Sequence, residues 1–354
     1  MDYDQDGLAD IYLLNYGSGS VNQLFHNNVG GVFEEIASSV GLDVGGDNWD
    51  AIFADYDDDN DLDLLTVGDS GTALLKNSAG QFASLSSSKG IADSEPAAAA
   101  AWIGSGFLVA GDNGTRLYEY EGSDRFSTDP ETSAESAGLD DPGTGSAISL
   151  ADYDGDGDDD IYLANTTGQN RLFKNLGDGT YQSVEEEAGA VELGNDASTD
   201  VNWITLPGDA FPSVFVADYE GNNHFYRNQG DRTFVDQAKD FGLQDPGYTT
   251  VSAWAENFIN GAPALFLGRW NEEDWDEEDK EPNLLYIPVT NNSGEVTDFE
   301  NAAHSAGVND TGQTLDAGWL DYDNDGYLDL LVILYDGGLR LYRNESHEVQ
   351  LCDE

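Results

Sequence analysis

Cysteine, basic residues and long apolar stretches are scarce in this sequence of 354 residues. The single cysteine, Cys352, has no partner for a disulfide within the chain, so cysteine usage leaves the redox compartment open. No run of about 18 or more apolar residues occurs, which excludes an ordinary transmembrane helix. Lys and Arg number 13 against 70 Asp and Glu, for a formal net charge of -57. Such a charge disfavours nucleic acid and anionic membranes and favours cations, although an acidic surface is also expected of a protein that stays hydrated in brine.

Signals for export and for catalysis are missing too. Met1 runs directly into an acidic loop with no signal peptide before it, so we expect the chain to be a fragment. The four histidines show no HExxH or other paired spacing, and no GxSxG, Walker A or dinucleotide-binding motif occurs. We therefore predict no catalytic residues and no enzyme activity.

Internal repetition is the main positive signal. The sequence DYDQDGLADIYLLN at residues 2–15 returns as DYDGDGDDDIYLAN at residues 152–165, and each is followed by a Leu-Phe-x-Asn strand, a Gly turn and a segment that starts with Phe or Tyr. Partial copies fill the rest of the chain, so we predict a single domain over residues 1–354 made of seven units. The predicted units cover approximately residues 1–46, 47–94, 95–142, 143–195, 196–246, 247–310 and 311–354.

Each unit reads as about four short strands, because alternating apolar segments are bounded by Gly, Asn and Asp turns. Seven such units predict an all-β, seven-bladed β-propeller of four-stranded antiparallel blades. A parallel β-helix is the second choice, and its period would be much shorter. Every later unit has an apolar strand before its loop, whereas the first begins at the loop, so we expect the first blade to be incomplete.

Four units carry an acidic loop with Asp at its positions 1, 3, 5 and 9. Alternating carboxylates in a curled loop suit a hard cation that takes 6–8 oxygen ligands, and position 7 is expected to add its backbone carbonyl. Calcium is favoured over magnesium, which retains more water. The predicted ligands of about four Ca²⁺ sites are Asp2, Asp4, Asp6, Leu8 and Asp10; Asp55, Asp57, Asp59, Asp61 and Asp63; Asp152, Asp154, Asp156, Asp158 and Asp160; Asp321, Asp323, Asp325, Tyr327 and Asp329.

Position 6 of these loops is Gly7, Gly157 and Gly326 in three copies and Asn60 in the other. We predict a positive φ there, because the turn is sharp and Gly and Asn tolerate that conformation best. The loops differ from an EF-hand, which closes with a Glu at position 12 between helices. A solvated Asp-rich turn is the alternative for one loop, and four copies in phase favour the metal.

The DxDxDGxxD loops resemble those of FG-GAP or VCBS repeats, as in integrin α-subunit propellers and many secreted microbial proteins. The tails FEEIASSVGLD at 33–43 and FVDQAKDFGLQD at 234–245 are similar to the propeller of cartilage acidic protein and ASPIC/UnbV-type proteins. The resemblance implies a seven-bladed propeller with calcium at the loops that join the first two strands of a blade. It also implies a secreted or cell-surface location and a role in adhesion.

The predicted function is a calcium-stabilised, non-catalytic binding scaffold for a protein or glycan ligand. A propeller enzyme acting on polysaccharide, as a lyase or hydrolase, is the second hypothesis, and an architectural matrix or surface-layer role is the third. The acidic insertion at residues 271–282 in the sixth unit is expected to be either a solvated loop or a partner-binding loop anchored by Trp270 and Trp275.

Overall fold

The computed structural model describes residues 1–17, 19–28, 31–85, 91, 94–104, 106–127, 129–190, 197–219, 221–259, 261–271 and 280–344. Most of the acidic insertion, including Trp275, and the segment from residue 345 onward therefore lie outside the described residues. Compactness divides the chain into two units, residues 1–148 with 173–183, and residues 149–172 with 184–354.

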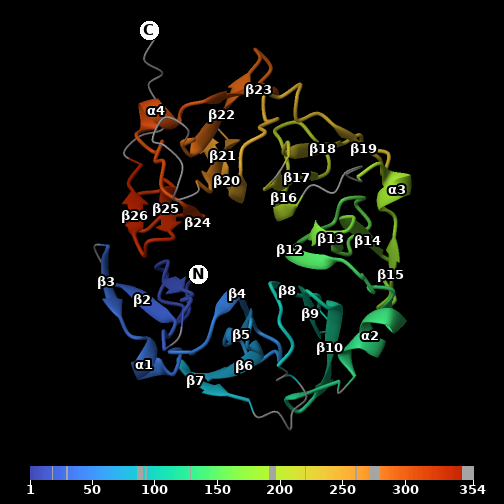
Figure 1. Ribbon diagram of the computed structural model, residues 1–354, viewed down its shortest axis with the longest axis vertical. Helices are drawn as coiled ribbons and strands as arrows, with labels where there is room; N and C mark the ends of the chain where they lie inside the picture. The colour runs from blue at the N-terminus through green and yellow to red at the C-terminus, as the bar shows by residue number, and fades with distance from the viewer. Residues whose placement is uncertain are drawn as a thin grey trace. The chain divides into compact units, whose positions relative to one another are not determined.

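Seven antiparallel sheets follow one another along the chain, and each is built from consecutive strands (Figure 1). The first three sheets are β1 (Ile11–Leu13), β2 (Gln23–Asn28) and β3 (Val32–Glu35); β4 (Asn48–Ala54), β5 (Asp63–Gly68), β6 (Gly71–Ser78) and β7 (Gln81–Ser84); β8 (Ala99–Trp102), β9 (Gly106–Gly111), β10 (Gly114–Gly122) and β11 (Arg125–Phe126). The next two are β12 (Thr144–Ala151), β13 (Asp160–Thr167), β14 (Arg171–Asn175) and β15 (Tyr181–Ser183); β16 (Ser198–Ile204), β17 (Ser213–Asp218), β18 (His224–Asn228) and β19 (Phe234–Asp236). The last two are β20 (Thr249–Ile259), β21 (Ala262–Arg269), β22 (Leu284–Thr290) and β23 (Val296–Asn301); β24 (Thr314–Leu320), β25 (Asp329–Leu334) and β26 (Leu339–Tyr342).

This succession of sheets confirms the predicted seven-bladed β-propeller. The first sheet has three strands, as expected from the missing apolar strand before the first loop. The last sheet also shows three strands within the described residues. The fourth strand that the sequence predicts for it falls on residues 346–354, outside the described part.

The core lies between neighbouring sheets, because the second strand of a blade is buried on both faces. In one cluster Phe215 of β17 and Phe225 of β18 pack with Leu265 of the next sheet. In another, Leu65 of β5 packs with Phe107 of β9. Full burial of one such side chain contributes about 1.5–3 kcal/mol, so packing between sheets stabilises the blades and holds the loops at their ends.

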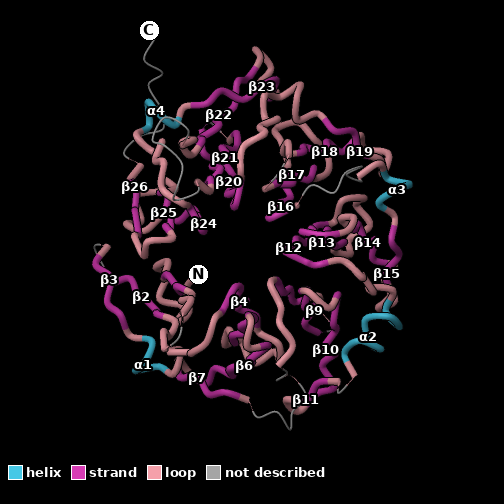
Figure 2. Tube along the Cα trace, viewed as in Figure 1, coloured by secondary structure: helices cyan, strands magenta, loops and turns pink. Residues whose placement is uncertain are grey.

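Four short helices follow the last strand of their blades, drawn in cyan in Figure 2. They are α1 (Ala37–Val40), α2 (Pro130–Ala137), α3 (Glu185–Ala188) and α4 (Ala303–Ala306). Each ends at a glycine with positive φ, and at Gly41 a Cβ would lie 2.3 Å from the carbonyl oxygen of Phe82. The repeated tail is thus a helical turn whose left-handed last residue favours glycine. No helix in the described ranges is long and apolar enough to cross a membrane.

Candidate cation-binding loops

The acidic loops occupy equivalent places in their own sheets. The second loop, residues 55–63, joins β4 to β5; the third, 152–160, joins β12 to β13; and the fourth, 321–329, joins β24 to β25. The first loop, residues 2–10, leads into β1. Each loop is therefore anchored where a buried strand begins, which fixes its closing residue firmly.

Two positions of every loop have left-handed backbone. Position 6 has φ of 88° at Gly7, 70° at Asn60, 96° at Gly157 and 89° at Gly326, which confirms the predicted positive φ. Position 4 is also left-handed, at Gln5, Asp58, Gly155 and Asn324, and this was not predicted because three of these residues are not glycine. The alternation of hand curls the backbone so that successive N–H groups turn toward the side chains of the loop.

Those N–H groups are held by the carboxylates at positions 1 and 5. Asp55 accepts from the N–H of Asp59 at Oδ1 (3.0 Å) and of Asn60 at Oδ2 (2.9 Å), and Asp59 in turn accepts from the N–H of Asp61 (3.0 Å). The same three bonds occur in the other loops. The position-7 residues, whose N–H groups donate to the position-5 carboxylates, are Leu8, Asp61, Asp158 and Tyr327. That their carbonyl oxygens bind the metal stays a prediction.

The carboxylates of each loop converge. Ligand atoms lie within 4.8 Å of one another in every group of the following set: Asp2, Asp4 and Asp6; Asp55, Asp57 and Asp63; Asp152, Asp154 and Asp160; Asp321, Asp323 and Asp325. Two carboxylates about 4 Å apart repel by roughly 4 kcal/mol at an effective dielectric constant of 20. A bound cation would offset that repulsion.

Position 3 carries the clearest sign of an unmet interaction. The side chain of Asp57 is 8% exposed, and its Oδ1 has no hydrogen-bond partner among the described residues. Oδ1 of Asp323 is also buried without a partner in the described part of the chain. Leaving a buried carboxylate oxygen unpaired is costly, and a bound cation removes that cost. The donor set and its burial thus fit a hard cation with oxygen ligands.

Position 9 has a structural role in addition to the predicted metal ligation. Asp10, Asp63, Asp160 and Asp329 are all buried. In the first, third and fourth loops one carboxylate oxygen accepts from the N–H of the position-2 residue. In the first, second and fourth loops a carboxylate oxygen accepts from the N–H of the Asn that closes the Leu-Phe-x-Asn motif or its variant. This Asp therefore ties the loop to the third strand of its blade. Burial raises the pKa of Asp63 to about 7.

Basic side chains beside the loops were not predicted as part of the sites. His26, Lys76 and Arg343 all occupy the variable position of the Leu-Phe-x-Asn strand, and each contacts the position-3 carboxylate of its own loop. In the third loop, Arg232 from the β18–β19 turn reaches Asp154 at 3.3 Å. The signal was present in the sequence, because this variable position is basic in every unit that carries a loop.

Each of the two units has an exposed aromatic pair at the end of its blades opposite to the acidic loops. Tyr16 follows β1 and lies against Trp49 at 5.1 Å between ring centroids, with the two residues 59% and 49% exposed. Trp270 follows β21 and meets Tyr335, which follows β25 and is 51% exposed, at 5.1 Å. Beside the second pair lies a cavity of about 270 Å³, lined in part by Asn271 and by other polar side chains. Exposed aromatic rings with polar neighbours are typical of ligand-contacting surfaces.

The fold and the repeated loops define a β-propeller with acidic turns. The family described as FG-GAP-like repeat matches residues 2–66, 107–163 and 152–205. The chain is therefore a β-propeller that contains FG-GAP-like repeats. The narrower similarity to ASPIC/UnbV-type proteins stays a prediction, and no curated protein matches the sequence.

Solved structures share the fold at low sequence identity. A candidate 6-phosphogluconolactonase from Bacteroides fragilis is 10% identical with a TM-score of 0.58, and the match covers 96% of this chain and 92% of that one. A lectin from Agrocybe aegerita is 16% identical with a TM-score of 0.54, covering 96% and 91%. The extracellular domain of a candidate hybrid two-component system from B. thetaiotaomicron is 12% identical with a TM-score of 0.51, covering 97% of this chain and 39% of that one. At these identities the likeness supports the propeller fold alone.

Proposed function

We propose that this propeller is a non-catalytic binding scaffold, secreted or on a cell surface, whose blades are stabilised by calcium in the acidic loops and which binds a protein or glycan ligand. The observation that supports the calcium most directly is the buried, unpartnered Oδ1 of Asp57 within a group of converging carboxylates. Calcium suits these loops because they offer several protein oxygens in a flexible arrangement.

In this proposal each aromatic pair is a separate ligand contact, at the end of its own blades away from the acidic loops. The pairs Tyr16–Trp49 and Trp270–Tyr335 supply flat apolar rings there, and Asp69 accepts a hydrogen bond from the indole Nε1 of Trp49 at 2.7 Å. Rings edged by carboxylate and amide groups suit the stacking and hydrogen bonding of a sugar or of an aromatic peptide side chain. The Agrocybe lectin, whose structure concerns recognition of terminal N-acetylglucosamine, makes the glycan the first ligand to test.

Calorimetric titration of chelator-treated protein tests the cation. We expect saturable calcium binding and a higher melting temperature, because calcium at about 100 times a site's dissociation constant adds about 2.7 kcal/mol. Asp57→Ala should remove one site, and Asp112→Ala, in a turn without an acidic loop, should remove none. A melting temperature that is the same in calcium and in chelator would contradict the proposed stabilisation.

A glycan and protein array in millimolar calcium tests the ligand. A hit should weaken by about tenfold or more in Trp49→Ala or Tyr335→Ala, since loss of an aromatic anchor that the ligand covers costs about 2 kcal/mol. The matched control is Leu176→Ala, an exposed apolar residue in the turn between β14 and β15. A ligand that is turned over during the assay would favour the enzyme hypothesis instead.

A further inference from the structure

The first acidic loop differs from the other three in the side chain that contacts it. We propose that Asp4, Asp10 and His26 form a site for a divalent transition-metal ion such as Zn²⁺, separate in its selectivity from the calcium loops. This inference rests on the proposed function in that it assigns a different ion to one of the same loops.

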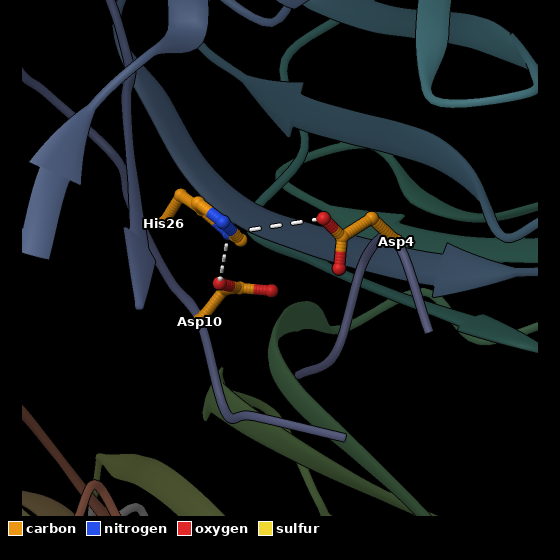
Figure 3. A group of neighbouring side chains, drawn as sticks. All are labelled: Asp4, Asp10 and His26. Atoms are coloured by element: carbon orange, nitrogen blue, oxygen red, sulfur yellow. Dashed lines mark hydrogen bonds and ion pairs between the residues drawn. The ribbon is translucent and has the colours of Figure 1, made fainter. Parts of the chain in front are cut away.

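The three side chains come together from the loop and the neighbouring strand (Figure 3). Nδ1 of His26, on β2, lies 3.0 Å from Oδ1 of Asp10 and 3.9 Å from Oδ2 of Asp4. A tetrahedral ion with Zn–N and Zn–O distances of about 2.0–2.2 Å holds its ligand atoms about 3.3–3.6 Å apart. The observed separations lie on either side of that range, so small side-chain shifts bring all three atoms to one ion.

Two of the three groups are already held in place. The Asp10 carboxylate accepts from the N–H of Tyr3 at 3.1 Å and of Asn27 at 2.8 Å, and its side chain is fully buried. The ring of Tyr3 meets the imidazole of His26 edge to face at 5.8 Å. Such outer contacts orient metal ligands and lower the cost of binding an ion.

Charge explains why this loop, and not the others, takes such an ion. Lys76 pairs with Asp57 and Asp59 in the second loop, and Arg343 with Asp323 in the fourth, so a fixed positive charge stands at this place. In the first loop an imidazole stands there, and no Lys or Arg of the described residues pairs with its carboxylates. A neutral imidazole is a good ligand for zinc and a poor one for calcium, which takes oxygen.

Titration with Zn²⁺ in saturating calcium tests the assignment, because calcium occupies the oxygen-only loops and suppresses adventitious binding. We expect one Zn²⁺ site in the unmodified protein, weakened by about tenfold or more in His26→Gln. The control is His224→Gln, which removes a second histidine that lies beside two carboxylates, those of Asp218 and Asp236, and should leave zinc binding unchanged. Circular dichroism confirms that each variant is folded.

A gain of function sharpens the test. Lys76→His places an imidazole beside Asp57 and Asp63 in the second loop and should create a second Zn²⁺ site. Zinc affinity that is unchanged in His26→Gln, or lost in His224→Gln, would overturn the proposal. Calcium titrations of the same samples separate the two hypotheses. Calcium binding without zinc binding contradicts this inference alone, whereas the absence of both calcium and zinc binding contradicts the proposed function as well.

Discussion

The second and fifth blades have the same four-stranded sheet but differ in the charges of the loop between their first two strands. In the second blade the loop between β4 and β5 has converging carboxylates, and one Lys76 contacts Asp57. In the fifth blade the connection between β16 and β17 contains a single acid, Asp209, and Arg227 binds it with two hydrogen bonds of 2.7 and 3.2 Å. A blade can therefore neutralise one loop carboxylate with its own arginine, whereas a loop with several carboxylates keeps an excess of negative charge that the proposed cation would offset.

The blades also show which part of the loop is structural. Asn77 in the second blade donates its N–H to Asp63 at 2.7 Å, and Asn228 in the fifth donates to Oγ of Ser213 at 3.1 Å. The amide of each Asn bonds a carbonyl oxygen just before the second strand, on Leu62 or on Pro212. The bond from the Asn N–H to position 9 is thus present also in a blade without the acidic loop. Position 9 therefore stabilises the fold, in addition to its proposed role in binding a cation.

The largest expected effect breaks this closing bond. Asp63→Ala should lower the free energy of unfolding by roughly 1–3 kcal/mol, because it leaves the buried N–H of Asn77 without its carboxylate acceptor. Ser213→Ala should cost about half as much, since its hydroxyl is a neutral acceptor and a bond to a carboxylate is about twice as strong. Urea unfolding in calcium and in chelator provides the measurement. A loss for Asp63→Ala seen only in calcium would mean that position 9 acts solely as a metal ligand.

The sequence was sufficient for the fold and for the loop carboxylates because both follow from local repetition. Period and turn residues predicted seven strand-rich units, and the position of Gly7 predicted a left-handed residue. The helical turns were not predicted, because units as short as Ala37–Val40 are set by the close approach of Gly41 to Phe82 and have no helical periodicity of their own.

The charged side chains that pair with the loop carboxylates were also not predicted from the sequence. Lys76 is 19 residues from Asp57 in the chain, and Asp124 joins the pair from the turn between β10 and β11 at 3.2 Å. Contacts of this kind depend on strand register and on which turn of the next sheet reaches the loop. The repeat pattern could have revealed the basic position in the third strand. It could not have revealed Asp124, the additional acid that pairs with Lys76.

Replacing Lys76 or Arg227 tests whether these two basic residues differ in their effect on calcium binding. Lys76→Met should raise calcium affinity at the second loop by about three- to tenfold and lower stability in chelator, because the ammonium both neutralises and competes at Asp57. The bond to Asp57 raises the pKa of Lys76, so the competitor stays charged at neutral pH. Arg227→Met is the matched control, and it should reduce stability equally with and without calcium. Unchanged calcium affinity in Lys76→Met would show that the two cations occupy different places.

The smallest expected effect is a change in how stability varies with pH, at the first strand of the same two blades. Asp200 on β16 accepts from Ser252 through both N–H (2.8 Å) and Oγ (3.0 Å), whereas the corresponding Asp50 on β4 accepts from the N–H of Ala100 in the next blade at 3.0 Å. Burial raises the pKa of Asp200, and the bonds from Ser252 partly offset that rise. The folded state therefore holds this proton more tightly than the unfolded chain does.

The sign follows from that difference. The contribution of Asp200 to stability is complete below the ordinary Asp pKa of about 3.9 and is lost as the pH rises through the higher value in the folded state. Asp200→Asn should remove this part of the slope, so the variant gains on the unmodified protein as the pH rises. Ser252→Ala should act in the opposite direction, because it removes a bond that favours the charged form. The loss of stability with rising pH should then extend to higher pH. Urea unfolding across that window, at one saturating calcium concentration, measures both. Parallel pH profiles for all three proteins would show that Asp200 does not titrate between the folded and unfolded states.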